Sequence, residues 1–108
     1  MKRIAYRCLL LATVALSSAC TWVDLSQQGE KVRVLDATEV SSCKLLGQTT
    51  SNTTAKVAGV RRHDNAINYE LVALARNAAA RMGGDTIVAE ASESDGHQTF
   101  LVYRCIQN

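Results

Sequence analysis

The cysteines at positions 43 and 105 constrain the fold of this chain more than any other feature of its sequence. Two cysteines allow one pairing, and closing a loop of roughly 60 residues stabilises a domain by about 4 kcal/mol in the chain-entropy model. A disulfide also needs Cα atoms within about 7 Å of each other. We therefore expect a Cys43–Cys105 disulfide between neighbouring strands, one before and one after a central helix.

Two other uses of Cys43 and Cys105 stay open at this point. A closed metal site needs four ligands, and only His63 and His97 are present to complete one. A redox dithiol usually has the spacing C-x-x-C, which these two cysteines lack. Both alternatives fit the sequence less well than a structural disulfide, so we expect no metal and no cofactor.

The N-terminal segment has the layout of an export signal. Three basic residues precede an apolar run at 8–16, and small residues follow at 17–19. The apolar run is much shorter than the roughly 20 residues that a helix needs to cross a bilayer. We therefore expect residues 1–19 to be a signal peptide. Its removal takes Cys8 away and leaves the domain in a compartment that favours disulfides.

The small residues directly before Cys20 resemble a bacterial lipobox, in which the cysteine is acylated and becomes the new N-terminus. Ser17 stands where a lipobox usually has Leu, and Leu16 lies one position earlier. Because several acyl chains such as palmitate hold a small domain firmly on a membrane, we expect lipidation at Cys20. Ordinary cleavage that leaves a plain thiol is the alternative. Thr21 and Trp22 follow instead of Asp, so the resemblance implies the periplasmic face of the outer membrane.

Residues 20–30 are polar and are expected to form a lipidated tether of at most about 33 Å, which leaves 31–108 as a single periplasmic domain. The chain carries 12 Lys and Arg against 10 Asp and Glu. Three of the basic residues belong to the signal peptide, so nine basic residues then face ten acidic ones. A nucleic-acid-binding domain would carry a basic surplus, so nucleic acid is not an expected partner.

The clearest predicted element is a helix over 65–82. Asp64 or Asn65 is a suitable N-cap, and Gly83 suits the left-handed position that ends a helix. The apolar residues are spaced by three or four positions and form one stripe, which we expect to face the core: Ile67, Leu71, Leu74, Ala78 and Met82.

Four strands are predicted around this helix, two before it and two after it: 31–36, 42–49, 85–91 and 98–107. Val32 and Val34 are expected on one face of the first strand, and Gly47 is expected at a bulge. Asp95 and Gly96 are expected to form a hairpin turn. The order predicts an α+β fold, a two-layer β-β-α-β-β sandwich in which one helix covers one face of a four-stranded sheet.

Three segments together resemble a family of short uncharacterised proteobacterial lipoproteins of the YjeI type: "LLG" after Cys43, "ARNAAARMGGDTIV" at 75–88 and "VYRC" ending at Cys105. The resemblance covers roughly residues 30–106, and it is distantly similar to the periplasmic domain of RcsF-like envelope stress sensors. Those sensors carry four domain cysteines and a long proline-rich linker, whereas this chain has two domain cysteines and no proline. The resemblance implies a periplasmic lipoprotein and envelope stress sensing as one role for it.

The segment at 50–65 is predicted to be a long polar loop, and Lys56, Arg61, Arg62 and His63 make it locally basic. Long loops are often functional. We therefore expect a contact surface for an acidic partner, lipopolysaccharide phosphates or a protein face, and a plain solvated loop is the alternative. Replacing its basic residues should change the stability little, because exposed charges contribute under about 1 kcal/mol.

His63 beside Asp64 and His97 near Asp95 lie in predicted loops and turns, so no catalytic group is expected there. "RMGGDT" at 81–86 runs from helix into strand, opposite to a phosphate loop. We therefore expect a protein that acts by contact and not as an enzyme. The leading expectation is an interaction module whose partner is an unknown envelope protein or cell-wall component. A structural envelope component that binds peptidoglycan or lipopolysaccharide is the alternative.

Overall fold

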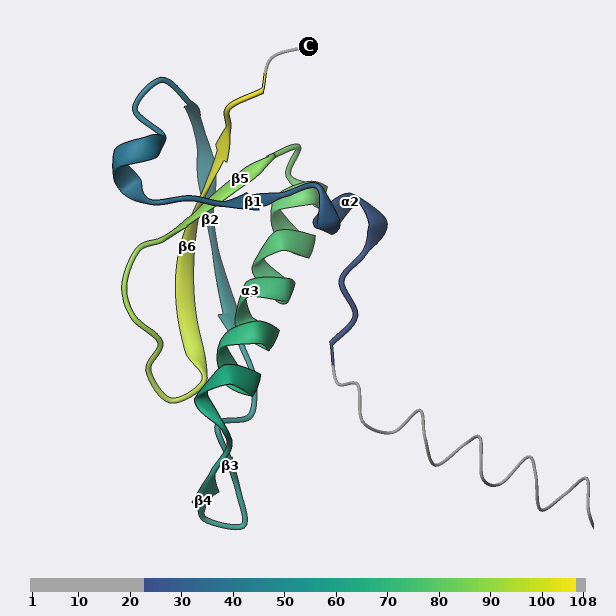
Figure 1. Ribbon diagram of the computed structural model, residues 1–108, viewed down its shortest axis with the longest axis vertical. Coiled ribbons are helices and arrows are strands. Elements are labelled where there is room, and N and C mark those ends of the chain that lie inside the picture. Colours follow the sequence, from purple (N-terminus) through teal and green to yellow (C-terminus); the bar gives the residue numbers. More distant parts are fainter. Residues whose placement is uncertain (1–22, 107–108) are drawn as a thin grey trace, which may run out of the picture.

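One long helix packs on a four-stranded sheet in the computed structural model, which describes residues 23–106 (Figure 1). The predicted signal peptide at 1–19 and the predicted lipidation site at Cys20 lie outside the described residues. The elements follow one another in this order: α2 (Gln27–Glu30), β1 (Arg33–Val34), the 3-10 helix η2 (Ala37–Glu39), β2 (Lys44–Asn52), β3 (Lys56–Val57), β4 (Val60–Arg61), α3 (Asp64–Arg81), β5 (Thr86–Ala89) and β6 (His97–Arg104). The predicted α+β fold is confirmed.

The sheet is mixed and has the strand order β1-β5-β6-β2. β1 runs parallel to β5, whereas β5 and β2 both run antiparallel to β6. The predicted turn between β5 and β6 is confirmed, because Asp95 and Gly96 both have positive φ. Ser94 and His97 exchange backbone hydrogen bonds across this turn.

The strand order places β1 and β2 at the two edges of the sheet.

The first two strands differ from their predicted lengths. Val32 precedes β1 and is buried, whereas Val34 is 51% exposed, so only the first of the two valines reaches the core. The carbonyl of Val32 accepts a hydrogen bond from Arg76 on α3, which turns this residue towards the helix. β2 continues past its predicted end as far as Asn52, and its register with β6 shifts next to Gly47, which confirms the bulge.

The face of α3 that reaches the core is only partly the predicted one. Ile67 and Leu71 are fully buried as expected, but Ala75 and Ala79 continue the buried stripe. The predicted Leu74 and Ala78 are half-buried, and Met82 is exposed. Small side chains face the core here because the sheet supplies the bulky ones, and the cluster around the two alanines contains Ile87, Phe100 and Val102.

The predicted N-cap of α3 is wrong, and the predicted C-terminal end of the helix is correct. The helix begins at Asp64, and the N-cap is His63, whose side chain makes no capping hydrogen bond. Asp64 is instead the first residue of the helix, and its carboxylate accepts a hydrogen bond from Arg61 at 3.0 Å. Gly83 has a φ of 80° and ends the helix as predicted, and the N–H of Gly84 bonds to the oxygen of Ala79 at 2.8 Å.

The predicted loop at 50–65 contains regular structure instead. After β2 ends, β3 and β4 pair as a small antiparallel hairpin, joined by Ala58 and Gly59, which both have positive φ. This hairpin, residues 56–61, extends beyond the N-terminal end of α3 (Figure 1). The prediction of an unstructured loop is therefore wrong for most of this segment.

The sheet is also covered in part on the side away from α3. Thr86 and Val88 alternate with Ile87 along β5, so their side chains point to the opposite face. Both are nevertheless buried, as is Val40 in the segment between η2 and β2. The expectation that the sheet buries one face only is therefore wrong around β5.

Candidate interaction surface

The four residues predicted to form a contact surface lie close together in sequence at the hairpin end of the molecule. Lys56 is an exposed residue of β3, Arg61 ends β4, and His63 is the exposed residue before α3. Arg62 lies between the last two and is half-buried. Two of the four, Arg61 and Arg62, form ion pairs within the domain, and this changes what each can contribute to a contact.

Arg62 fixes the hairpin to α3. Its guanidinium donates two hydrogen bonds to the carboxylate of Glu70, at 2.8 and 2.7 Å, and another to the backbone oxygen of Thr54 at 2.9 Å. Thr53 donates to the same carboxylate at 2.6 Å, and Glu70 is buried. The hydrogen bonds from Arg62 hold the pKa of Glu70 below its ordinary value of 4.5, although burial opposes this.

Arg61 joins the hairpin to the start of α3 and to the β5–β6 connection. It donates hydrogen bonds to Asp64 at 3.0 Å and to Glu93 at 2.6 Å. Glu93 also accepts a hydrogen bond from the N–H of Gly96 at 2.8 Å. The hydrogen bonds from Gly96 and then from Arg61 hold the pKa of Glu93 below its ordinary value of 4.5. The hairpin is thus held at its base by charged side chains.

The premise of the stability prediction, that the basic residues are exposed charges, does not hold for Arg62, which is half-buried and paired with Glu70. Removal of Arg62 would leave a buried carboxylate without its charge partner, which is strongly unfavourable. The side chains that do face solvent here include two that sequence analysis missed, Val57 and Val60, which are 52% and 69% exposed. Gly59 between them was the available signal for a turn, but Ala58 before it is not typical of a two-residue hairpin turn.

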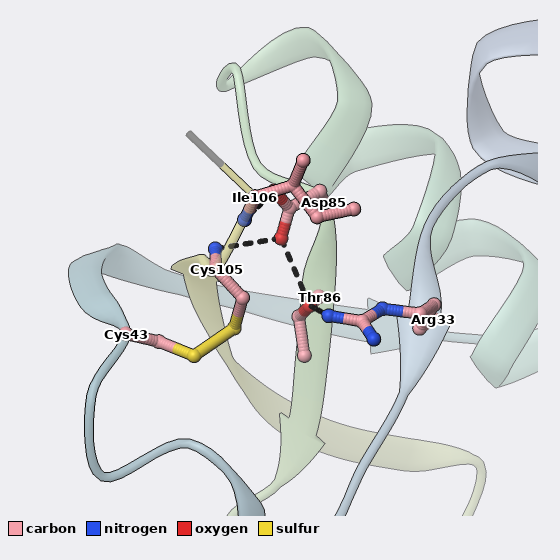
Figure 2. Close-up of a disulfide and its surroundings, with 6 residues drawn as sticks. All are labelled: Arg33, Cys43, Asp85, Thr86, Cys105 and Ile106. Carbon is pink, nitrogen blue, oxygen red and sulfur yellow. Dashed lines mark hydrogen bonds between the residues drawn. A yellow bond between two sulfur atoms is a disulfide. The ribbon is translucent and has the colours of Figure 1, made fainter. Parts of the chain in front are cut away.

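The disulfide and Asp85 close the other end of the β2–β6 pair (Figure 2). Cys43 and Cys105 are bonded with their Cα atoms 4.4 Å apart, so the predicted disulfide between neighbouring strands is confirmed. Asp85 accepts hydrogen bonds from the N–H groups of Cys105 at 2.8 Å and Ile106 at 2.7 Å, and from the hydroxyl of Thr86 at 2.9 Å. Burial raises the pKa of Asp85, but these hydrogen bonds outweigh it and leave the pKa below 3.8.

Residues 24–32, called the arm below, pack along α3. The side chain of Asn77 accepts a hydrogen bond from the N–H of Ser26 and donates one to the backbone oxygen of Asp24, both at 2.9 Å. The predicted tether at 20–30 is therefore too long, because the folded domain begins by residue 24. Sequence analysis missed this contact, since it joins a polar segment to a polar helix face without any apolar period.

Arg76 holds the second half of the arm. It donates hydrogen bonds to the backbone oxygens of Glu30 at 2.7 Å and Val32 at 2.9 Å. Gly29 is buried directly against Asn77, and a Cβ atom at this position would overlap the Asn77 side-chain oxygen. The adjacent Arg76 and Asn77 of the helix therefore act as a clamp on the arm, and Gly29 is the residue that lets the arm approach.

Next to the arm, the outer side of α3 carries a shallow hollow of about 330 Å³. Leu25 of the arm and Tyr69, Val72 and Ala73 of α3 give it apolar walls, and Arg76 lies at its margin. Tyr69 is largely exposed. The hollow therefore adds an apolar patch close to the point where the chain leaves the described domain.

The histidines belong to no metal-binding cluster among residues 23–106. No group of three His, Cys, Asp or Glu side chains in this range could hold a metal ion. His97 contacts the side-chain oxygen of Asn52 across the β2–β6 pair, and Asp95 lies in the adjacent turn. None of the helices in the same range combines the length and apolar character that a membrane crossing requires.

The fold and the covalent bond define a small α+β domain with one disulfide. The chain belongs to the family described as Domain of unknown function (DUF4156), whose model matches residues 23–105. The match begins at the arm and ends at Cys105, so the family's domain includes both the clamp and the disulfide. No curated protein and no solved structure matches the chain. Membership of an uncharacterised domain family is thus confirmed, whereas the likeness to YjeI-type lipoproteins and RcsF-like sensors stays a prediction.

Proposed function

We propose that the protein is a lipoprotein attached through Cys20 to the periplasmic face of the outer membrane, and that its domain acts as an interaction module in the cell envelope. It binds an envelope protein by contact and carries out no catalysis. Envelope stress sensing is the physiological role that its resemblance to RcsF-like sensors suggests. The Cys43–Cys105 disulfide supports an oxidising compartment outside the cytoplasm.

The observation that carries the proposal is the clamp on the arm. Asn77 binds the backbone of Asp24, so a lipidated Cys20 would lie only four positions before a residue that is fixed on α3. That length reaches at most about 14 Å when extended. A lipid anchor at Cys20 would therefore hold the domain next to the membrane in a restricted range of orientations, as an interaction module there requires.

The hairpin supports the contact part of the proposal. Exposed apolar patches that are surrounded by polar residues mark sites of protein interaction. Val57 and Val60 are more than half exposed, while Arg61 and Arg62 fix the base of the hairpin on Glu93 and Glu70. The hairpin therefore presents apolar surface without needing to order itself on binding.

The anchor is tested by metabolic labelling with a palmitate analogue. The full-length protein should be labelled, and Cys20→Ala should abolish the label and leave an unprocessed precursor. A Cys43→Ser/Cys105→Ser variant, which lacks the disulfide but keeps Cys20, serves as the control and should still be labelled. Processing of Cys20→Ala to a soluble periplasmic form would contradict the proposed anchor.

The contact function is tested by crosslinking in cells followed by purification under denaturing conditions. Discrete protein adducts are the expected result for an interaction module. Recovery of the protein mainly with peptidoglycan or lipopolysaccharide would instead favour a structural envelope component. Labelling and crosslinking can fail separately, so the anchor and the contact function are tested independently of each other.

A further inference from the structure

The free edge of β2 is the longest open strand edge in the part of the chain that the structure describes. β2 runs over Lys44–Asn52 and pairs with β6 on one side only. In an antiparallel pair, every second residue of an edge strand directs its N–H and C=O away from its partner. These groups are a template for one more strand.

A groove of about 280 Å³ runs along this edge, between β2 and α3. Its walls come from four consecutive residues of β2 and from three residues of α3: Thr49, Thr50, Ser51, Asn52, Leu74, Ala78 and Arg81. Consecutive strand residues point to opposite faces of a sheet. A groove lined by four of them in a row therefore follows the edge of the strand and not one of its faces.

Ser51 is the buried residue of the groove. This residue is only 4% exposed, and its hydroxyl oxygen is the one buried side-chain polar atom without a hydrogen bond among residues 23–106. An added strand would therefore meet the backbone of β2 at this residue and not its buried hydroxyl.

The α3 side of the groove supplies apolar surface and one charge. Leu74 and Ala78 belong to the apolar stripe that the sequence assigned to the core, yet both are only half-buried. Arg81 lies at the exposed end of the helix and makes no ion pair with any of residues 23–106. The groove therefore combines an open backbone edge, small apolar contacts and an uncompensated positive charge.

We propose that the groove binds an extended segment of a partner polypeptide, which pairs with the β2 edge as an additional strand. Backbone hydrogen bonds to β2 would provide affinity, and alternate side chains would provide specificity. The segment would place small apolar side chains on Leu74 and Ala78 and an Asp or Glu side chain at Arg81. This inference rests on the proposed function as an interaction module, and it adds to the hairpin a second contact site and the chemistry of the segment that binds there.

The test uses the purified full chain in detergent and a phage-displayed library of random ten-residue peptides. We expect the recovered peptides to alternate small apolar with polar residues and to carry an acidic residue near one end. As synthetic peptides they should bind saturably and slow hydrogen exchange of the outward-facing β2 amides. N-methylation of alternate peptide amides should weaken binding at least tenfold, because it blocks strand pairing with the unchanged protein.

Two charge reversals provide a matched comparison. Arg81→Glu should weaken binding at least tenfold, whereas Arg104→Glu, an equally exposed change at the far end of β6, should leave it unchanged. Failure to recover any peptide, or binding that tolerates both N-methylation and Arg81→Glu, would overturn the proposal. So would a homodimer whose β2 amides are already protected without peptide, because a second copy would then occupy the edge. None of these results depends on lipidation or on crosslinking in cells.

Discussion

The two ends of the β2–β6 pair are held by different kinds of interaction. At the end where β2 begins, Cys43 and Cys105 are covalently bonded, and Asp85 binds the backbone that follows β6. At the end where β2 finishes, the hairpin is held by the ion pairs of Arg61 and Arg62, and it exposes valines. The first end depends on a covalent bond and backbone contacts, and the second depends on charged side chains.

The disulfide end therefore serves as a scaffold, and the hairpin end presents a surface for contact. A disulfide restricts the conformations of the unfolded chain. It also holds β2 and β6 together at the first end whether or not the second end is folded. The hairpin adds little buried apolar surface of its own, and its order follows from a few polar contacts to α3. Substitutions at the disulfide end should therefore act on the whole domain, and substitutions at the hairpin end should act mainly on that end.

The largest effect is expected from removing the disulfide. The cysteines are 62 positions apart, and the chain-entropy model gives a loss of about 4 kcal/mol in the free energy of unfolding for a loop of this length. Chemical denaturation of the oxidised protein, compared with Cys43→Ser/Cys105→Ser, measures this loss. Thiol titration of the unfolded, unreduced protein should find neither of these two thiols, and two reactive thiols would contradict the account.

The next largest effect is expected from Arg62→Ala. This change leaves the buried Glu70 carboxylate without the guanidinium that binds it. The melting temperature should fall by several degrees, whereas Lys56→Ala on the exposed side of the same hairpin should change it little. Equal melting temperatures for the two variants would show that the ion pair does not hold the hairpin.

The acid dependence of stability should report the same ion pair. The folded pKa of Glu70 lies below 4.5 because Arg62 binds the carboxylate. Its contribution is therefore fully present above that pH and is lost as the pH falls towards the folded pKa. Unfolding free energies measured from pH 6 downwards should fall less steeply in Glu70→Gln than in the native protein. Asp85 and Glu93 also have lowered pKa values, so the slope should decrease and not vanish.

A smaller and more local effect is expected from Gly29→Ala. The added Cβ atom would overlap the Asn77 side chain and displace the arm. Hydrogen exchange of residues 24–32 should become faster, with little change in β5 and β6. In an Asn77→Ala background the same substitution should have less additional effect, because the overlapping atom is gone. Unchanged exchange in Gly29→Ala would mean that the clamp does not fix the arm.

Much of the disulfide end was predictable from the sequence, because its signals are local or have few alternatives. Cys43 and Cys105 allow one pairing, and Gly83 suits a helix end. At the opposite end, the Asp95-Gly96 turn was predictable for the same reason, because its composition is standard for a hairpin. The one important contact missed at the disulfide end is Asp85, whose carboxylate binds backbone N–H groups from the far end of the chain. Nothing in its neighbourhood signals such a contact.

The hairpin end and the arm were predicted poorly for physical reasons. Ala58 adopts a positive φ that a non-glycine residue rarely takes, which hid the β3–β4 turn. Arg62 and Glu70 are eight positions apart, across a helix start, so no periodicity links them. The buried stripe of α3 turned towards Ala75 and Ala79 because the sheet opposite is bulky, and this depends on tertiary packing alone.

The most direct test of the account compares the two ends in living cells. A photo-crosslinking amino acid replaces either Val60 at the hairpin tip or Ile106 beside the disulfide, which are both exposed apolar residues at 69% and 50%. Discrete protein adducts are expected from position 60, and few or none from position 106. Adducts mainly from position 106, or none from either position under conditions where the protein is processed normally, would contradict the proposed role of the hairpin.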